Sequence, residues 1–326
     1  MQISVVIPAF DEAESLPDLL QRLVPELASI ATTSEVIVVD DGSRDGTAEA
    51  VLALGLPTVA VERLRVNRGK SGALRAGLAI AKGDVIVLMD ADGQDDPAEL
   101  PRLLAALDDG LDGSDGLDGS DGLDGSHGLD GSHGLDLVTG RRAHRNDRAA
   151  KRLPSRLYNW TTARVTGVPG RDFNSGFKAM RRDVARDLDL YGELHRYIPV
   201  LAHWAGYRTG EVDVTHHPRV EGRSKFGAER FWRGMLDLVT VKFLTTYTGR
   251  PFHLFGGIAA LCGLAGTALL TWMLALRISG EAVGSRPALS AGVLLVVVAV
   301  QLGSLGLIAE LLVHLRRARP PDERDR

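Results

Sequence analysis

This chain has very little cysteine and no excess of positive charge. The single cysteine among 326 residues, Cys262, excludes an internal disulfide and fits a folded part that faces a reducing compartment. Lysine and arginine (38) do not outnumber aspartate and glutamate (42), so the chain lacks the basic excess of a nucleic-acid-binding protein. The first residues, "MQISVVIPAF", lack the basic start and long apolar core of a signal peptide, and they predict a strand.

Two segments contain no charged residue at all. Residues 252–276 and 288–309 carry no Asp, Glu, Lys or Arg, and each exceeds the roughly 20 residues that cross a bilayer. A pair of buried core helices is the alternative interpretation, but the length and the composition rich in Leu, Val and Gly favour membrane spans. We therefore expect a two-helix transmembrane hairpin over 251–315.

The distribution of basic residues predicts the orientation of this hairpin. The linker "RISGEAVGSR" is short, so both outer ends lie on the same side of the membrane. Lys242, Arg250 and the "RRAR" run of the tail, 316–326, favour a cytoplasmic location for that side. Arg277 and Arg286 of the linker weaken this bias without reversing it. The sequence predicts a multi-pass protein of the cytoplasmic (inner) membrane whose larger part faces the cytoplasm.

The first 110 residues alternate Val/Ile-rich strands with helical stretches. "ISVVIP", "EVIVVD", "PTVAVERL" and "DVIVLMD" predict strands, and the apolar spacing over 14–29, 47–54 and 70–82 predicts helices between them. This order is typical of an α/β fold with a mainly parallel sheet, in which ligands bind beyond the carboxyl ends of the strands. The acidic segments "VVDDGS" and "LMDADGQDD" fall at those ends, so we expect them at one rim.

A repeat interrupts this pattern. Leucine recurs every six residues from 111 to 135 in the units "LDGSDG" and "LDGSHG". Four units are too few to bury the core of a hexapeptide β-helix, and calcium binding by the aspartates is the other special interpretation. Because the segment has little apolar surface, we interpret 112–134 as an acidic loop inserted into a domain that spans 1–228.

Two segments before the hairpin predict contact with a membrane surface. Residues 141–186 carry thirteen Lys or Arg against three Asp, which suits phosphate groups or anionic lipid, although solvated helix faces explain part of this charge. Residues 229–250 mix aromatic and apolar residues with charges and predict an interfacial amphipathic helix, with a packed domain helix as the alternative.

The stretch "VIVLMDADGQDDP" places four aspartates at the end of a predicted buried strand. Neighbouring carboxylates raise one another's pKa unless a cation or donors compensate them, so this is either a solvated turn or a cation site. Asp90 and Asp92 can reach one Mg²⁺ or Mn²⁺, with Gln94 as a third oxygen ligand and substrate phosphates completing the shell. Asp95 and Asp96 are predicted to start the following helix.

Asp40 and Asp41 end the second predicted strand. One interpretation is a turn in which Ser43 or Asp45 caps the next helix. A carboxylate here can also accept hydrogen bonds from ribose hydroxyls or a base N–H, which predicts a nucleotide contact. The nearby "NRGKSG" fails the P-loop pattern because Leu64 stands where glycine is required, and its own glycines predict a helix start that approaches a phosphate or packs closely.

Six motifs occur in an order that points to one family. They are "SVVIPAFDEAESL", "VVDDGSRDGT", "NRGKSGAL", "DADGQDDP", "RDFNSGFKAMRRDV" and "HHPRVEGRSKFG". This order resembles family 2 glycosyltransferases, most closely the polyprenyl-phosphate branch with dolichol-phosphate mannose synthase and the bacterial undecaprenyl-phosphate glucosyltransferases. The resemblance covers roughly residues 3 to 250, and the hexad repeat departs from it. It implies a GT-A nucleotide-diphospho-sugar transferase fold, followed by interfacial helices and the hairpin.

The resemblance also implies roles for individual residues. Those expected to hold the nucleotide sugar are Pro8, Phe10, Glu12, Val38, Asp40, Asp90, Ala91, Arg219 and Lys225. Those expected to hold the metal ion are Asp90, Asp92 and Gln94. Those expected to act in catalysis are Asp92, Arg141 and Ser175. Arg141, like Arg219 and Lys225, is expected to face phosphate, and Ser175 is expected near the acceptor phosphate. Phe10 stands where many members have Tyr, which keeps the ring contact and loses the hydroxyl.

The implied reaction is inverting transfer of a single hexose from UDP-glucose or GDP-mannose to undecaprenyl or dolichyl phosphate, assisted by Mg²⁺ or Mn²⁺. A phosphate monoester with a second pKa of about 6 is largely a dianion at neutral pH, so the attack requires no side-chain base. His195, His216 and His217 are therefore interpreted as structural.

Other activities stay open at this point. A processive polysaccharide synthase usually has more spans and a Gln-x-x-Arg-Trp motif, where this chain has "ELHRYIP". An inactive nucleotide-sugar sensor and a membrane nucleotidyltransferase are further alternatives. The expected partners are a nucleotide-sugar donor, a polyprenyl phosphate acceptor and the membrane, with no nucleic acid; a homo-oligomer stays open.

Overall fold

The computed structural model describes residues 1–109, 134–142, 159–168, 170–217, 251–284 and 286–318. The chain divides into two units, Met1–Val241 and Lys242–Arg326, which are separate bodies. The predicted interfacial helix at 229–250 and nearly all of the hexad repeat lie outside the described residues. The predicted domain boundaries therefore stay predictions.

The first unit is built on one sheet, in the strand order β3-β2-β1-β4-β6-β5-β7 among the described residues. The strands are β1 (Gln2–Ala9), β2 (Thr33–Asp40), β3 (Val59–Arg63), β4 (Val85–Leu88), β5 (Leu137–Arg142), β6 (Lys178–Arg181) and β7 (Thr209–Val214). Only β6 runs against its neighbours in this sheet, so the predicted mainly parallel α/β architecture is confirmed. Because of this reversal, β6 begins at the rim where β4 ends.

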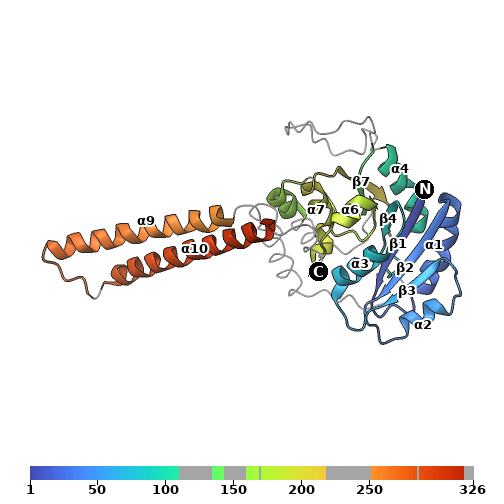
Figure 1. Cartoon of the computed structure of the whole chain (residues 1–326), viewed down its shortest axis with the longest axis horizontal. Coiled ribbons are helices and arrows are strands. Elements are labelled where there is room, and N and C mark those ends of the chain that lie inside the picture. Colours follow the sequence, from blue (N-terminus) through green and yellow to red (C-terminus); the bar gives the residue numbers. More distant parts are fainter. Residues whose placement is uncertain (110–133, 143–158, 169, 218–250, 285, 319–326) are drawn as a thin grey trace. The chain divides into compact units, whose positions relative to one another are not determined.

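Helices cover both faces of the sheet (Figure 1). One face carries α1 (Leu16–Ile30), α2 (Thr47–Leu52) and α4 (Leu100–Asp109). The other carries α3 (Gly69–Ile80), α6 (Arg182–Asp187) and α7 (Ile198–Trp204). Short 3₁₀ helices, η1 (Pro97–Glu99) and η2 (Leu194–Tyr197), precede α4 and α7. The first three helices match the predicted ranges to within a few residues.

The alternation of side chains along the strands produces these two layers. Val5 and Ile7 of β1 belong to the core beneath α1, whereas Val6 between them packs with α3 on the opposite face. Helix α1 turns five leucines toward the sheet, at the three- and four-residue spacing that lines one helix face. Both faces are thus buried, which explains why the central strands read as continuous apolar runs.

The hexad repeat leaves and rejoins the fold at neighbouring points. The described chain stops at Asp109, the end of α4, and resumes at Gly134, the last residue of the fourth repeat unit. A Cβ added to Gly134 would stand 2.5 Å from the carbonyl oxygen of Asp108 and 2.6 Å from that of Leu107. The chain therefore returns beside the last turn of α4, at the amino end of β5.

The second unit contains two long helices, α9 (Pro251–Ile278) and α10 (Pro287–Ala318), that run side by side (Figure 1). Their apolar lengths of 28 and 29 residues are sufficient to cross a bilayer. Few residues of these stretches are buried, unlike those in the core helix of a soluble protein.

Close contacts join α9 and α10. A Cβ added to Gly266 would stand 2.9 Å from the carbonyl oxygen of Gly292, so the small residues let the two backbones approach. Near the start of α9, the backbone N–H of Phe252 donates to a carboxylate oxygen of Glu310 at 3.2 Å, which satisfies one of the open donors at that helix end. The helices therefore form a hairpin.

Candidate active site

The turn after β4 starts at the carboxyl rim of the sheet. The backbone N–H of Met89 still donates to Val6 of β1, at 3.2 Å, and the chain then leaves the sheet. The backbone N–H of the next residue, Asp90, donates to Oδ2 of Asp95 at 3.3 Å. Asp95 is buried, and burial raises the pKa of its carboxyl group. Asp95 therefore stabilises the turn from inside.

The Asp90 carboxylate lies between a lysine and a glycine. Nζ of Lys70, at the first turn of α3, forms an ion pair with Oδ1 of Asp90. A Cβ added to Gly176 would stand 2.3–2.4 Å from the three carboxyl atoms of Asp90, so only glycine fits there. Burial opposes ionisation of Asp90, but the Lys70 ammonium holds its pKa below the usual value. Asp90 is thus an ionised carboxylate at the rim.

A buried lysine and a buried histidine lie near this ion pair. Lys178, at the start of β6, is 2% exposed and donates to the carbonyl oxygen of Ser175. Burial and the positive charge of Lys70 lower the pKa of Lys178 to about 8. The same two causes lower the pKa of His195 to about 2, so His195 is neutral at physiological pH.

The hydrogen bonds of Ser71 fix the ring of His195. Oγ of Ser71 accepts from the backbone N–H of His195 at 3.1 Å and lies 3.0 Å from its Nδ1. Ser71 therefore contacts both the backbone and the ring of His195.

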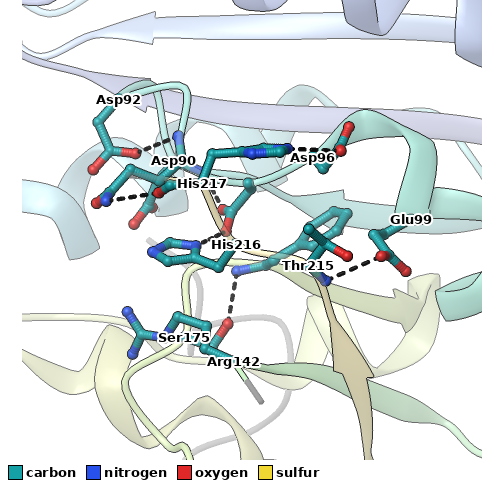
Figure 2. Close-up of polar contacts among 12 residues, drawn as sticks. Asp90, Asp92, Asp96, Glu99, Arg142, Ser175, Thr215, His216 and His217 are labelled. Atoms are coloured by element: carbon teal, nitrogen blue, oxygen red, sulfur yellow. Dashed lines mark hydrogen bonds and ion pairs between the residues drawn. The ribbon is translucent and has the colours of Figure 1, made fainter. Parts of the chain in front are cut away.

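Residues 215–217, which follow β7, bind the turn from its other side (Figure 2). The backbone N–H of His217 donates to the carbonyl of Gln94 at 2.8 Å, and Nε2 of Gln94 donates to the carbonyl of His217 at 3.2 Å. Oδ1 of Asp92 accepts from the backbone N–H of Gln94 at 3.2 Å. These bonds set the shape of the turn that carries Asp90, Asp92 and Gln94.

Both neighbouring histidines pair with carboxylates here. Nδ1 of His216 lies 3.5 Å from Oδ1 of Asp95, and Nε2 of His217 lies 2.8 Å from Oδ2 of Asp96 (Figure 2). Asp96 also accepts from the backbone N–H of Ala98 at 3.1 Å, which confirms it as the cap of η1. The same prediction for Asp95 is wrong, because its carboxylate is buried beneath the turn and faces His216.

The loops after β1 and β2 are joined by hydrogen bonds. Asp11, with φ of 55°, donates through its backbone N–H to Oγ of Ser43 at 3.0 Å. Oδ1 of Asp40 accepts from the backbone N–H of Ser43 at 2.8 Å, so Asp40 takes part in the turn. Asp45 accepts from the backbone N–H of Thr47 at 3.0 Å, but the N-cap of α2 is Gly46 and no side chain caps it, so the prediction that Ser43 or Asp45 caps this helix is wrong.

The described residues predicted to bind the nucleotide sugar lie at the rim, within strands β1 and β2, and in the turn after β4. Phe10 is 38% exposed at the rim, and the partly buried Glu12 accepts from Oγ of Ser15 at 2.6 Å. Pro8 pairs with β2 within the sheet, and Val38 is buried in the core under α1. Ala91, in the turn after β4, is buried, and its carbonyl accepts from Oγ of Ser15 at 3.0 Å. Glu12 and Ala91 therefore both lie against Ser15, the residue before α1.

Adjacent arginines on β5 each hold an aspartate. Arg141 makes a two-point contact with Asp213 of β7, with its NH2 group 2.6 Å from Oδ2. Arg142 makes a similar contact with the buried Asp172, at 2.6 and 2.8 Å. Ser175 is buried, and its Oγ accepts from the backbone N–H of Phe177 at 3.3 Å.

The catalytic roles predicted for these side chains stay predictions. Arg219 and Lys225 lie outside the described residues. Lys70 and Lys178 are the site residues that sequence reasoning missed. The signal for Lys70 is its place in "NRGKSG", where the sequence analysis considers the glycines and not the lysine.

Comparison with known proteins identifies the enzyme class. The sequence model described as Glycosyl transferase family 2 matches residues 4–189. The chain belongs to this family. It is 33% identical to the dodecaprenyl-phosphate galacturonate synthase of Rhizobium johnstonii, over 96% of this chain and 88% of that protein. It is 35% identical to the undecaprenyl-phosphate 4-deoxy-4-formamido-L-arabinose transferase of Pseudomonas paraeruginosa, over 98% of this chain and 88% of that protein.

Solved structures show the fold of this glycosyltransferase. Glucosyl-3-phosphoglycerate synthase from Mycobacterium tuberculosis, in complex with Mn²⁺ and uridine-diphosphate-glucose, aligns with a TM-score of 0.53 at 20% identity, over 75% of this chain and 78% of that chain. The family 2 enzyme thus has the predicted GT-A fold. The predicted resemblance to the polyprenyl-phosphate branch is confirmed as well.

Proposed function

We propose that this family 2 glycosyltransferase transfers one sugar from a nucleotide sugar to a polyprenyl phosphate at the inner membrane. The observation that carries the proposal is an acidic turn at the carboxyl rim, in one chain with two helices long enough to cross a bilayer. Relatives whose names specify polyprenyl-phosphate acceptors match nearly the whole chain and support it.

The donor atoms of the turn suit a hard divalent cation. Asp90, Asp92 and Gln94 offer oxygens alone, and no cluster of three or more His, Cys, Asp or Glu in the described ranges would hold a metal by itself. Mg²⁺ and Mn²⁺ commonly take one or two carboxylates and fill the remaining positions with substrate phosphate and water. Asp90, Asp92 and Gln94 would therefore hold the ion, which when bound neutralises the leaving diphosphate.

The acceptor supplies its own nucleophile. Its phosphate, with a second pKa of about 6, is largely a dianion at neutral pH, so its oxygen attacks C1 of the sugar without a protein base. The C1–O bond to the nucleoside diphosphate breaks as the new bond forms, which inverts the anomeric centre. Arg141, Arg219 and Lys225 orient the anionic acceptor beside the donor, near Ser175.

The nucleotide is bound at the loops after β1 and β2, where Phe10 offers an exposed ring and Asp40 a carboxylate. UDP-glucose and GDP-mannose are the first donors to test. The names of the relatives specify a uronate and a formamido-arabinose, so nucleotide-linked forms of both belong in the same screen.

The membrane hairpin would keep the enzyme at its lipid acceptor, with the catalytic unit facing the cytoplasm. In the linker, Arg286 forms an ion pair with Glu281. Lys and Arg are fewer in this linker than beside the outer ends of the two helices, which supports placing the linker on the far side.

The test is a transfer assay with the purified full chain, undecaprenyl phosphate, Mg²⁺ or Mn²⁺, and each donor in turn. Asp92→Ala removes a proposed metal ligand, and Asp84→Asn, an exposed carboxylate beside the opposite end of β4, is the matched control. Lipid-linked sugar from one donor, lost in Asp92→Ala and kept in Asp84→Asn, supports the proposal. Donor binding without transfer from any donor contradicts it and favours a sensor.

A further inference from the structure

Two lysines near Asp90 differ in their access to solvent. Lys178 is 2% exposed, and its ammonium donates to the carbonyl of Ser175. The side chain of Lys70 is 31% exposed and forms a direct ion pair with Oδ1 of Asp90. Lys178 is therefore fixed inside the protein, whereas Lys70 can exchange its partner for water.

The Asp90 carboxylate is partly enclosed. Its backbone N–H is held by Asp95 at 3.3 Å, its carboxyl group packs against Gly176, where a Cβ would stand 2.3–2.4 Å from its atoms, and its side chain is 33% exposed. A carboxylate with reduced hydration is costly unless a cation or donor compensates it. Lys70 supplies this compensation, and both partners of the ion pair keep access to solvent.

A divalent cation on the same oxygen excludes the Lys70 contact. Two positive groups at one carboxylate oxygen repel each other strongly where the effective dielectric is low. Lys70 can leave without a change of backbone, because its ammonium is at the end of a flexible four-carbon chain. Lys178 has no comparable path, because it is buried and bound to the turn before β6.

We propose that Lys70 is an exchangeable counter-ion of Asp90. It pairs with Oδ1 while no divalent cation is bound, and it yields this oxygen when the cation arrives with the nucleotide sugar. The proposal rests on the proposed function, in which Asp90 is a metal ligand. The released ammonium is then available to the donor's diphosphate as a charged hydrogen-bond donor, while Lys178 stays in place in both states.

The test measures binding of Mn²⁺ alone to the full chain in detergent, from the electron paramagnetic resonance signal of free Mn²⁺. Lys70→Met removes the competing charge and keeps the bulk of the side chain. Lys70→Arg keeps a competing cation, and Lys82→Met changes an exposed lysine beyond the far end of α3. We expect Lys70→Met to bind Mn²⁺ at least about tenfold more tightly than wild type, and both other variants to stay within about twofold of it.

Equal or weaker Mn²⁺ binding by folded Lys70→Met overturns the proposal. Lys70→Gln, which keeps a neutral hydrogen-bond donor to Asp90, replaces it if the Met variant does not fold. Adding Asp90→Asn to Lys70→Met must abolish the gain, and a gain that persists means that the ion binds elsewhere, which also overturns the proposal.

A failure of the proposed function has a different signature. If wild type and variants do not bind Mn²⁺ even with a nucleoside diphosphate present, the counter-ion proposal fails together with metal assistance. Lipid-linked sugar made by the same preparations would then show that the transferase activity stands without them. If wild type binds Mn²⁺ and makes product while Lys70→Met gains no affinity, only the counter-ion proposal fails.

Discussion

Two acidic strand ends lie on the same rim, and their carboxylates are compensated differently. After β2, Asp40 and Asp41 accept hydrogen bonds from backbone N–H groups at 2.8 and 2.7 Å. After β4, Asp90 is compensated by the ammonium of Lys70. The backbone donors, on Ser43 and Arg68, are fixed by the fold, and the guanidinium of Arg63 adds a longer contact to Asp40 at 3.9 Å. A side-chain ammonium, by contrast, can leave. The comparison separates carboxylates held mainly by backbone donors from a carboxylate that can change partners.

The largest expected effect comes from removing a carboxylate at the β4 end. Asp92→Ala should lower the rate of sugar transfer by at least about 100-fold, because stabilisation of a leaving diphosphate by a metal amounts to several kcal/mol. Single-turnover transfer to undecaprenyl phosphate measures this. A rate within about threefold of wild type would contradict a metal-binding role for this turn.

Gly176→Ala tests whether the position of Asp90 matters. The added methyl group would overlap the Asp90 carboxylate, so we expect the transfer rate to fall about 10- to 100-fold, as small displacements of catalytic groups commonly do. Gly55→Ala is the control, because Gly55 has φ of 62° and open space around it and lies before the amino end of β3, so that variant loses stability away from the carboxyl rim. Equal losses of rate in both variants would mean that destabilisation alone explains the effect.

His195→Gln addresses the neutral histidine beside the β4 end. The pKa of His195 is about 2 in the folded protein and about 6.5 in the unfolded chain, so the unfolded state binds more protons as the pH falls below about 6.5. Stability should therefore be lost on acidification, by about 2 kcal/mol between about pH 7.5 and about pH 5. Thermal unfolding in detergent should show this loss in wild type and a smaller one in His195→Gln. Identical pH dependence would contradict a buried neutral ring.

Asp41→Asn at the β2 end should have the smallest effect. Asparagine keeps an oxygen that accepts from the backbone N–H of Arg68, and burial already raises the pKa of Asp41. We expect a change in the free energy of unfolding below about 1 kcal/mol and transfer rates within about threefold of wild type. A loss as large as that of Asp92→Ala would remove the distinction between the two strand ends.

The sequence was sufficient for the features that depend on local pattern. Apolar runs ending in aspartates placed Asp40 and Asp90 on one rim, because parallel strands bring their carboxyl ends together. The cap at Asp96 followed from residue preferences at helix starts. The GT-A fold was predicted from the order of the motifs.

Contacts between distant segments were beyond such patterns. Lys178 reaches the neighbourhood of Asp90 only because β6 runs against β4, and strand direction is not written in the short segment itself. Asp95 was taken for a helix cap because its partner, His216, lies beyond β7. The charge of Asp90 is compensated by Lys70 from another part of the chain, so the motif around Asp90 does not reveal this contact.

The return of the chain beside α4 has a consequence for how the length of the repeat can vary. The ends of the hexad repeat are neighbours at the amino end of β5, away from the carboxyl rim, and Gly134 lies against the carbonyls of the last helical turn. Doubling the length of a loop between fixed ends costs only about 0.6 kcal/mol. A six-residue unit can therefore be gained or lost at little cost to the stability of the fold, at a point away from the residues proposed to bind the substrates.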